Sequence, residues 1–472
     1  MIRRFVLFLL LVATTSAFAG TGRILIINTD PPGTGFNDPT PATPVGGNSG
    51  TTLGEQRLNV FRQAAERWGY ALDTNVDIIV QASFAPIPGC TATEGVLGFA
   101  RAINFRANFA GAPRQNVWYP AALANKFADS DLSPGQSDIE IRFNASVDNP
   151  SCLGDTDWYY GFDGKEGSDT SLYHVVLHEI AHGLGISGNG APEFFDNIPS
   201  VFDTHALDLE AGLRWDQMTP EQRAASMTNT GQLVWDGENV KKAVTQYLIP
   251  VTMLTITAPS VIARNYDVGT AAFGPALNRA SMTGTIVQAT DAGNSDGPAT
   301  TDGCTAFTNA GAISGKIALI DRGTCTFVRK ATNAAAAGAI GVIVADNRRD
   351  TCLPPGMAGD APDITIPVLS ITMDDGLAVK GQLAGSPVNA MLRVDPSQLA
   401  GTSPEGYVRL YAPCTLNVGS SIYHFDIVST PNLLMEPFIN DDLLNSLDLA
   451  VHQLIDMGWS LPPRSGRRAL RR

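Results

Sequence analysis

The chain has 472 residues, too many for one ordinary domain, so we expect two or three domains. Its composition, with 44% hydrophobic and 17% charged residues, is that of a globular protein. The net charge of −14 speaks against nucleic acid as a partner, because a phosphate backbone needs a basic protein face.

The first 19 residues have the pattern of a secretory signal peptide. Two arginines form a basic start, an apolar run extends from Phe5 to Val12, and "AFA" at residues 17–19 fits an A-x-A cleavage site. The apolar run is too short to span a bilayer comfortably, and no later segment is long and apolar enough. We therefore expect a secreted protein, extracellular or periplasmic, with no membrane span after cleavage of the signal.

All six cysteines lie after the cleavage site, at positions 90, 152, 304, 325, 352 and 414. An even number in an exported chain predicts up to three disulfides, and the spacing leaves all 15 connectivities open. No Cys-x-x-Cys pair occurs, which disfavours a cysteine-based zinc knuckle.

The N-terminal part is predicted to be a mixture of strands and helices. An apolar run at Ile24–Ile27 predicts a strand, and a loop rich in Gly, Pro, Thr and Asn follows at residues 31–52. Residues 53–69 carry apolar side chains at helical spacing and end at a glycine. Residues 76–87 and 137–146 predict two further strands, the second alternating between apolar and polar positions.

The stretch "VVLHEIAHGLGISG" at residues 175–188 contains candidate metal ligands and a candidate catalytic base. On a helix, residues four apart project from one face, so His178 and His182 can hold one ion. Glu179 stands beside the first histidine, where it can take a proton from a zinc-activated water. Gly185 follows at the spacing of the metzincin motif, in which glycine turns the chain beneath the metal. This pattern predicts one catalytic zinc ion and a helix that holds it.

A third protein ligand is needed to complete a tetrahedral zinc site with water. Gly188, at the usual metzincin position, has no side chain to offer. Nearby alternatives follow in "APEFFDNIPSVFDTHALDLE": Glu193, Asp203, His205, Asp208 and Glu210. A carboxylate ligand such as Asp203 or Asp208 would give a different class of zinc protease, although Gly185 argues against the thermolysin-like form.

Residues 273–395 differ from the preceding part of the chain in composition, with fewer charged residues and more Gly and Ala. A strand at 316–320, a helix at 327–337 and a strand at 340–345 form a predicted βαβ unit. "ITIPVLSITMDDG" adds a strand and the start of another helix. We interpret this segment as a separate α/β insert.

The C-terminal part offers a distant third ligand. His424 stands in "YHFDIVSTPNLLMEP", and Met435 follows in an apolar turn. Metzincins place a methionine-containing turn beneath the zinc after the third ligand, so these two residues supply the missing parts in order. His174, one turn before His178, is expected to be a packed neighbour. His452 lies in a predicted amphipathic helix at 443–457 and is expected to be structural.

"HEIAHGLG", a long insertion and then "YHFD…LLMEP" resemble the leishmanolysin-type metzincins, whose third histidine is separated from the helix by an inserted domain. The resemblance implies zinc bound by His178, His182 and His424, Glu179 as the base and Met435 as the Met-turn. Gly188 excludes the metzincin subfamilies with a short motif.

The insert, with "GKIALIDRGTCTF", "NAAAAGAIGVIVADN" and "IPVLSIT", resembles a protease-associated (PA) domain. Such domains accompany secreted proteases and receptors and carry no catalytic residues. The resemblance implies that the domain binds substrate or controls access to the catalytic site, and Cys304 and Cys325 are candidates for a disulfide within it.

The expected fold class is α+β, a metzincin-like catalytic domain interrupted by an α/β PA-like domain. The segments are a signal peptide at 1–19, catalytic parts at 20–270 and 396–460, the insert at 271–395 and a basic tail at 461–472. The tail is expected to be a solvated end, with sorting or surface attachment as the alternative. Acidic loops such as "DWYYGFDGKEGSD" offer oxygen ligands for structural calcium but match no defined loop pattern.

The expected activity is hydrolysis of protein or peptide substrates by a secreted zinc metalloendopeptidase, with Glu179 as general base. Two alternatives stay open at this point. One is a zinc protease with Asp203 or Asp208 as third ligand, and the other is a non-catalytic secreted protein that binds partners through the PA-like domain.

Overall fold

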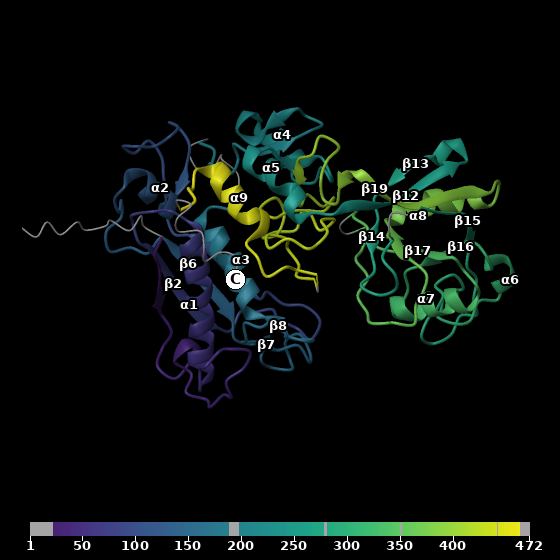
Figure 1. Cartoon of the computed structure of the whole chain (residues 1–472), viewed down its shortest axis with the longest axis horizontal. Helices are drawn as coiled ribbons and strands as arrows, with labels where there is room; N and C mark the ends of the chain where they lie inside the picture. Colours follow the sequence, from purple (N-terminus) through teal and green to yellow (C-terminus); the bar gives the residue numbers. More distant parts are fainter. Residues whose placement is uncertain (1–21, 188–197, 278–280, 350–351, 441, 463–472) are drawn as a thin grey trace, which may run out of the picture.

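The computed structural model describes residues 22–187, 198–277, 281–349, 352–440 and 442–462. The expected signal peptide, Gly188, Glu193 and all but two residues of the basic tail lie outside these ranges. The chain is a mixed α and β protein, and Figure 1 shows two lobes, the first built from both ends of the chain and the second from its middle.

The first lobe is centred on a four-stranded sheet of order β1-β2-β6-β3. Three strands are parallel, namely β1 (Ile24–Asn28), β2 (Ile78–Ala85) and β6 (Ile139–Asn144), and β3 (Gly98–Ala102) runs antiparallel at the edge. Buried and half-buried residues alternate along β2, as expected for a strand with unlike faces. The first three strands were predicted from the sequence, whereas β3 was not.

Two helices, α1 (Leu53–Ala71) and α3 (Leu172–Leu184), pack on this sheet and on each other. The side chain of Thr52 caps α1 by accepting the N–H of Glu55. The indole N–H of Trp68 donates to the carbonyl of Leu177 at 2.9 Å, which ties the two helices together inside the core. α3 is therefore held by contacts with both α1 and the sheet.

Short elements complete the N-terminal part: η1 (Gly35–Asn37), β4 (Phe105–Arg106), β5 (Tyr119–Pro120), α2 (Ala121–Ala128), β7 (Trp158–Tyr159) and β8 (Thr170–Ser171). Figure 1 shows α2, β7 and β8 in the same lobe as the central sheet and α3.

A second, smaller sheet joins the two ends of the first lobe. Its order is β10-β9-β11-β20, all antiparallel, with β9 (Ala206–Asp208), β10 (Leu213–Arg214), β11 (Leu233–Trp235) and β20 (Val408–Arg409). Around it lie η3 (Trp215–Gln217), α4 (Pro220–Ser226), α5 (Glu238–Tyr247) and α9 (Asp448–Met457). Strand β20 follows the insert in sequence, so it returns the chain to the first lobe.

The predicted C-terminal helix at 443–457 is shorter in the structure, because α9 begins only at Asp448. Residues 443–447 are not helical, and the Asp448 carboxylate accepts backbone N–H groups from Leu434 and Ala450. The apolar periodicity of the sequence continued across this turn, which is why the prediction extended too far.

The second lobe contains an eight-stranded sheet of order β13-β12-β19-β15-β16-β17-β18-β14. Its strands are β12 (Pro250–Ala258), β13 (Arg264–Tyr266), β14 (Gly269–Thr270), β15 (Met282–Gln288), β16 (Ile317–Asp321), β17 (Gly341–Ala345), β18 (Val368–Ile371) and β19 (Val388–Leu399). The helices are η4 (Ser260–Ile262), α6 (Ala310–Ile313), α7 (Phe327–Ala336) and α8 (Met373–Leu383). The predicted βαβ unit is β16, α7 and β17.

The insert is attached through the antiparallel pair β12 and β19, which pair from Pro250 with Leu399 to Ala258 with Asn389. Below this pair the N–H of Ala400 donates to the carbonyl of Ile249 at 2.9 Å. The expected boundary between residues 270 and 271 falls inside the eight-stranded sheet, because β12, β13 and β14 belong to it. The sequence pattern of β12 to β14 was not recognised as part of the insert.

Three disulfides join Cys90 with Cys152, Cys304 with Cys325 and Cys352 with Cys414. The pair Cys304 and Cys325 was the candidate for a disulfide within the insert. The bond between Cys352 and Cys414 links the insert to the segment that carries His424. None of the helices in the described part of the chain has the length and apolar character needed to cross a membrane.

Candidate metal centre

Helix α3 presents the predicted motif on a rigid support. Its apolar residues, among them Val176 and Ile180, are fully buried, and they fix the helix against the sheet and α1. The helix ends at Gly185, whose φ of +134° is a conformation that residues with a side chain rarely adopt. A Cβ atom there would also lie 3.2 Å from Cγ of Pro120. Gly185 therefore ends the helix in a conformation that suits glycine.

The structure brings His178, His182 and His424 together. Their Nε2 atoms form a triangle with sides of 3.0 Å between His178 and His182, 3.1 Å between His178 and His424, and 3.2 Å between His182 and His424. Within the described residues this is the one group of three or more His, Cys, Asp or Glu side chains whose ligand atoms lie within 4.8 Å of one another.

The opposite ring nitrogens fix the protonation of all three imidazoles. Each Nδ1 lies at hydrogen-bond distance from a backbone carbonyl oxygen: His178 from Leu434 at 2.6 Å, His182 from Ile186 at 2.5 Å and His424 from Ser420 at 2.6 Å. A carbonyl can only accept a hydrogen bond, so every Nδ1 must carry the proton. The neutral rings therefore direct three unprotonated Nε2 lone pairs at one point.

Burial keeps the imidazoles neutral. It lowers the pKa of His178 to about 3 and that of His182 to about 4, and the neighbouring ring adds to the effect at His178. The pKa of His424 is also lowered well below its ordinary value, mainly by burial. Three lone pairs about 3 Å apart repel one another unless a cation lies between them.

A tetrahedral zinc ion fits this triangle. Zinc–nitrogen bonds of about 2.0–2.1 Å place the ligand atoms of a tetrahedron about 3.3–3.4 Å apart, close to the separations observed here. The donor set of three neutral imidazoles, each oriented by a carbonyl on its far nitrogen, is the chemistry that zinc prefers.

Glu179 lies beside the triangle and is almost fully buried, with 6% of its surface exposed. Burial raises the pKa of this carboxyl group to about 8, while a hydrogen bond from the backbone of Ala100 acts in the opposite direction. Since Ala100 belongs to β3, the carboxyl group lies next to the edge strand of the central sheet.

Met435 is fully buried and lies in a turn that contacts the histidines through its backbone. Its carbonyl accepts the N–H of Phe425, next to His424, and the carbonyl of the preceding Leu434 holds His178. The segment around Met435 therefore connects the last histidine with the first.

Sequence reasoning missed the groups that orient the histidines. The carbonyls of Leu434, Ile186 and Ser420 leave no trace in residue type, since every residue has one. A structural role for Asp448 could have been predicted, because it is an acidic residue within an apolar stretch near the start of a predicted helix. Its Oδ2 accepts the N–H of Leu434 at 2.7 Å and thereby fixes the carbonyl that holds His178.

Replacing Asp448 by asparagine should weaken zinc binding by about tenfold or more, because partners that orient a ligand typically contribute that much. An amide nitrogen in this place would face a backbone N–H instead of accepting from it. Zinc affinity measured by competition with a chelator tests this. Asp360→Asn, at an exposed position, is the control and should leave the affinity unchanged.

The carboxylates considered as alternative ligands are engaged elsewhere. Asp203 accepts the N–H of Ser200 at 2.7 Å, and Asp208 accepts from the backbone of Glu210 and from the side chain of Asn229. His205 lies 3.4 Å from a carboxylate oxygen of Asp236. None of them belongs to the histidine group as far as the structure describes the chain.

The two remaining predictions for histidines agree with a structural role. His174 is buried, with 6% of its surface exposed, and its ring lies 5.8 Å from that of Tyr173. His452 packs at 5.9 Å from the ring of Tyr247. The acidic loop at 157–169 forms no ligand cluster of the kind described above among the described residues, so the expectation of structural calcium finds no support there.

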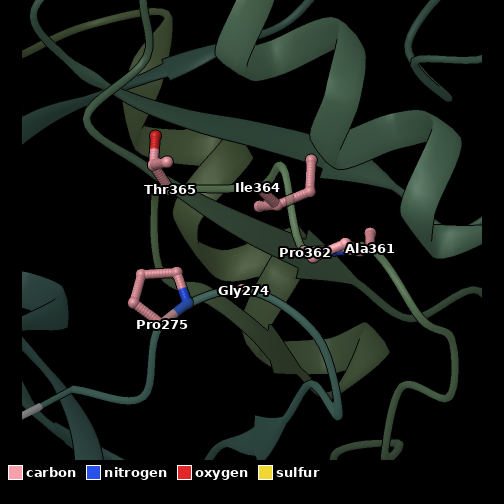
Figure 2. Close-up of a pocket in the computed structure, with 6 residues that line it drawn as sticks. All are labelled: Gly274, Pro275, Ala361, Pro362, Ile364 and Thr365. Atoms are coloured by element: carbon pink, nitrogen blue, oxygen red, sulfur yellow. The ribbon is translucent and has the colours of Figure 1, made fainter.

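A separate hollow of about 390 Å³ lies in the second lobe. Figure 2 shows its lining, which consists of Gly274, Pro275, Ala361, Pro362, Ile364 and Thr365. None of these side chains is titratable. The lining shares no residue with the histidine triangle.

The PA domain family matches residues 282–379, so the insert contains a PA domain. Two curated relatives share stretches of similar length with this chain. The ER degradation-enhancing alpha-mannosidase-like protein 3 of Homo sapiens is 46% identical over 82 residues, which are 16% of this chain and 9% of that protein. An aminopeptidase of Pseudomonas aeruginosa is 45% identical over 87 residues, 17% of this chain and 16% of that protein.

The chain thus spans between a tenth and a sixth of the length of these relatives. Their names describe unrelated activities, so the shared stretch does not identify a reaction. Among solved structures, a zinc aminopeptidase from Bacillus subtilis is 22% identical and covers 38% of each chain, but with a TM-score of 0.23 it carries no argument about this fold. The likeness of the histidine-bearing segments to leishmanolysin-type metzincins therefore stays a prediction.

Proposed function

We propose that this chain is a secreted zinc metalloendopeptidase with a leishmanolysin-like catalytic domain that is split by the PA domain. One observation carries the proposal, namely the three Nε2 lone pairs of His178, His182 and His424 that converge on one point. Three unprotonated nitrogen atoms this close together in a buried site need a cation between them. A zinc peptidase has its general base next to such a cation, and Glu179 directly follows His178 in the chain.

Zinc, when bound, supplies Lewis-acid chemistry that polarises the scissile carbonyl and makes water more acidic. The three histidines would hold it, and their carbonyl partners keep the ring planes in place. Burial alone favours the protonated form of Glu179, and a cation held by the histidines would favour the carboxylate. That carboxylate can accept the proton of the attacking water and then pass it to the leaving amine.

The edge strand β3 favours an endopeptidase. It is the last strand of the central sheet, and its backbone reaches Glu179 at Ala100. An extended peptide can add to an exposed strand edge through main-chain hydrogen bonds. A substrate bound in this way would pass the histidine triangle with chain on both sides of the scissile bond.

The domain division follows from this proposal. The catalytic domain would consist of the residues before β12 and after β19, and the insert between them would contact substrate without contributing to the reaction. Export fits the three disulfides, since such bonds persist in oxidising compartments. The predicted signal peptide at 1–19 is part of this proposal.

An internally quenched peptide with an acetylated N-terminus and an amidated C-terminus tests the proposal. We expect the purified protein to hold one zinc per chain and to cleave this peptide internally, as seen by fluorescence and by mass spectrometry of the products. Blocking the ends should change the rate little, because an endopeptidase binds the chain on both sides of the scissile bond and needs no free terminus.

Two outcomes would contradict the proposal. Release of N-terminal residues alone, from unblocked peptides only, would indicate an aminopeptidase. A protein that holds zinc but cleaves neither peptides nor unfolded proteins would favour the non-catalytic alternative, in which the PA domain binds partners.

A further inference from the structure

The disulfide between Cys304 and Cys325 lies against a buried lysine. Lys330 is completely buried, and its Nζ is 3.6 Å from Sγ of Cys304 and 3.5 Å from Sγ of Cys325. The same ammonium group donates to the backbone carbonyl of Asp302. A cationic side chain therefore touches both sulfurs of one disulfide inside the PA domain.

The ammonium group has little compensation in its surroundings. Burial lowers the pKa of Lys330, and the more distant carboxylates of Asp302, Asp291 and Asp321 only partly oppose this. No ion pair with a carboxylate is formed by Lys330 among the described residues. A buried charge of this kind gains much from an anion that appears next to it.

The other two disulfides lack this feature. Both sulfurs of Cys352 and Cys414 face the carbonyl oxygen of Arg349, at 3.7 and 3.3 Å, which disfavours negative charge on sulfur. Within the described residues, no cationic side chain lies against the sulfurs of the Cys90–Cys152 pair.

The positions of the two cysteines decide which sulfur an incoming thiolate can reach. Cys325 directly precedes Thr326, the N-cap of the ten-residue helix α7 (Phe327–Ala336). Cys325 is half-buried, whereas Cys304 is only 3% exposed. An attacking thiolate would therefore reach the sulfur of Cys325, and the sulfur of Cys304 would leave.

We propose that Cys325 is a site of covalent modification by low-molecular-mass thiols, with Lys330 stabilising the leaving thiolate. The sulfur of the incoming thiolate forms a bond with Sγ of Cys325, and the bond between Cys325 and Cys304 breaks. The electron pair of that bond stays on Sγ of Cys304, next to the ammonium group. No further oxidant or reductant takes part, and the product is a mixed disulfide at Cys325 with a thiolate at Cys304.

Graded reduction of the full folded chain with glutathione, followed by alkylation and peptide mapping, tests this. We expect Cys304 and Cys325 to react before Cys352 and Cys414. Solvent access alone predicts no such order, because Cys325, Cys352 and Cys414 are all half-buried. Reaction of Cys352 and Cys414 first would overturn the proposal.

Lys330→Met is the matched variant, since methionine fills a similar volume without charge. It should slow formation of the mixed disulfide at Cys325 by about tenfold or more, because a neighbouring cation lowers the pKa of a thiol by at least about one unit. Lys316→Met, at an exposed position of the same domain, is the control and should behave as wild type. An unchanged or increased rate in Lys330→Met would also overturn the proposal, and the order of reduction in the wild type decides the matter if this variant fails to fold.

Discussion

Replacing Glu179 by glutamine is expected to abolish peptide hydrolysis and to leave zinc bound. Glutamine keeps the shape of the side chain but cannot accept the proton of the attacking water. General acid–base groups typically contribute about 10²–10⁴-fold to a rate, so kcat should fall by at least that range. Zinc content should stay at one per chain, because Glu179 is not part of the histidine triangle.

The rate with the quenched peptide and the zinc content by elemental analysis are measured on the same sample. Glu238→Gln, at an exposed position in α5, is the control and should keep full activity. A Glu179→Gln protein with undiminished activity would show that the proton is taken by another group and would exclude the proposed role.

Replacing His424 by alanine is expected to remove both zinc and activity. Two histidines on α3 remain, but they supply only two of the three protein ligands of a catalytic zinc site. The affinity for zinc should fall by several orders of magnitude, and the residual activity should be below detection. Zinc content after dialysis against a mild chelator measures the first effect.

The same experiment separates the histidine from the carboxylate alternatives. His205→Ala should retain zinc, because His205 pairs with Asp236 away from the triangle. Asp203→Asn and Asp208→Asn should also retain zinc, apart from any loss of folded protein. If His424→Ala keeps its zinc and an aspartate variant loses it, the third ligand is a carboxylate and the leishmanolysin-like assignment is wrong.

Helix α3 of the metal centre could be predicted from the sequence because the residues that define it are close together in the chain. Two histidines at a spacing of four residues, an adjacent glutamate and a following glycine define one face and one end of α3. The position of His424 could be proposed only because the chain has six histidines and a methionine follows this one. That it lies 3.1 Å from His178 depends on how β20 and the Met435 turn pack, and no local pattern contains this information.

The parts that could not be predicted depend on backbone groups and on strand pairing. Three carbonyl oxygens orient the imidazoles, and a carbonyl has no sequence signature. The start of the insert at β12 was missed because its partner β19 lies about 130 residues later in the chain. Pairing at that distance is decided by the whole sheet and cannot be judged from the strand alone.

The antiparallel pair of β12 and β19 also bears on how the chain folds. His182 and His424 are 242 residues apart, yet Ile249 and Ala400 are joined by a hydrogen bond at the base of the insert. If the PA domain folds first, it brings these two points together and shortens the loop that must close before the three histidines can meet. The entropy of that closure rises only slowly with loop length, by about 0.6 kcal/mol for each doubling. The free energy needed to bring the three histidines together therefore depends little on the size of the domain inserted between them. An insertion at this position adds little closure entropy as long as the first and last residues of the inserted domain lie next to each other.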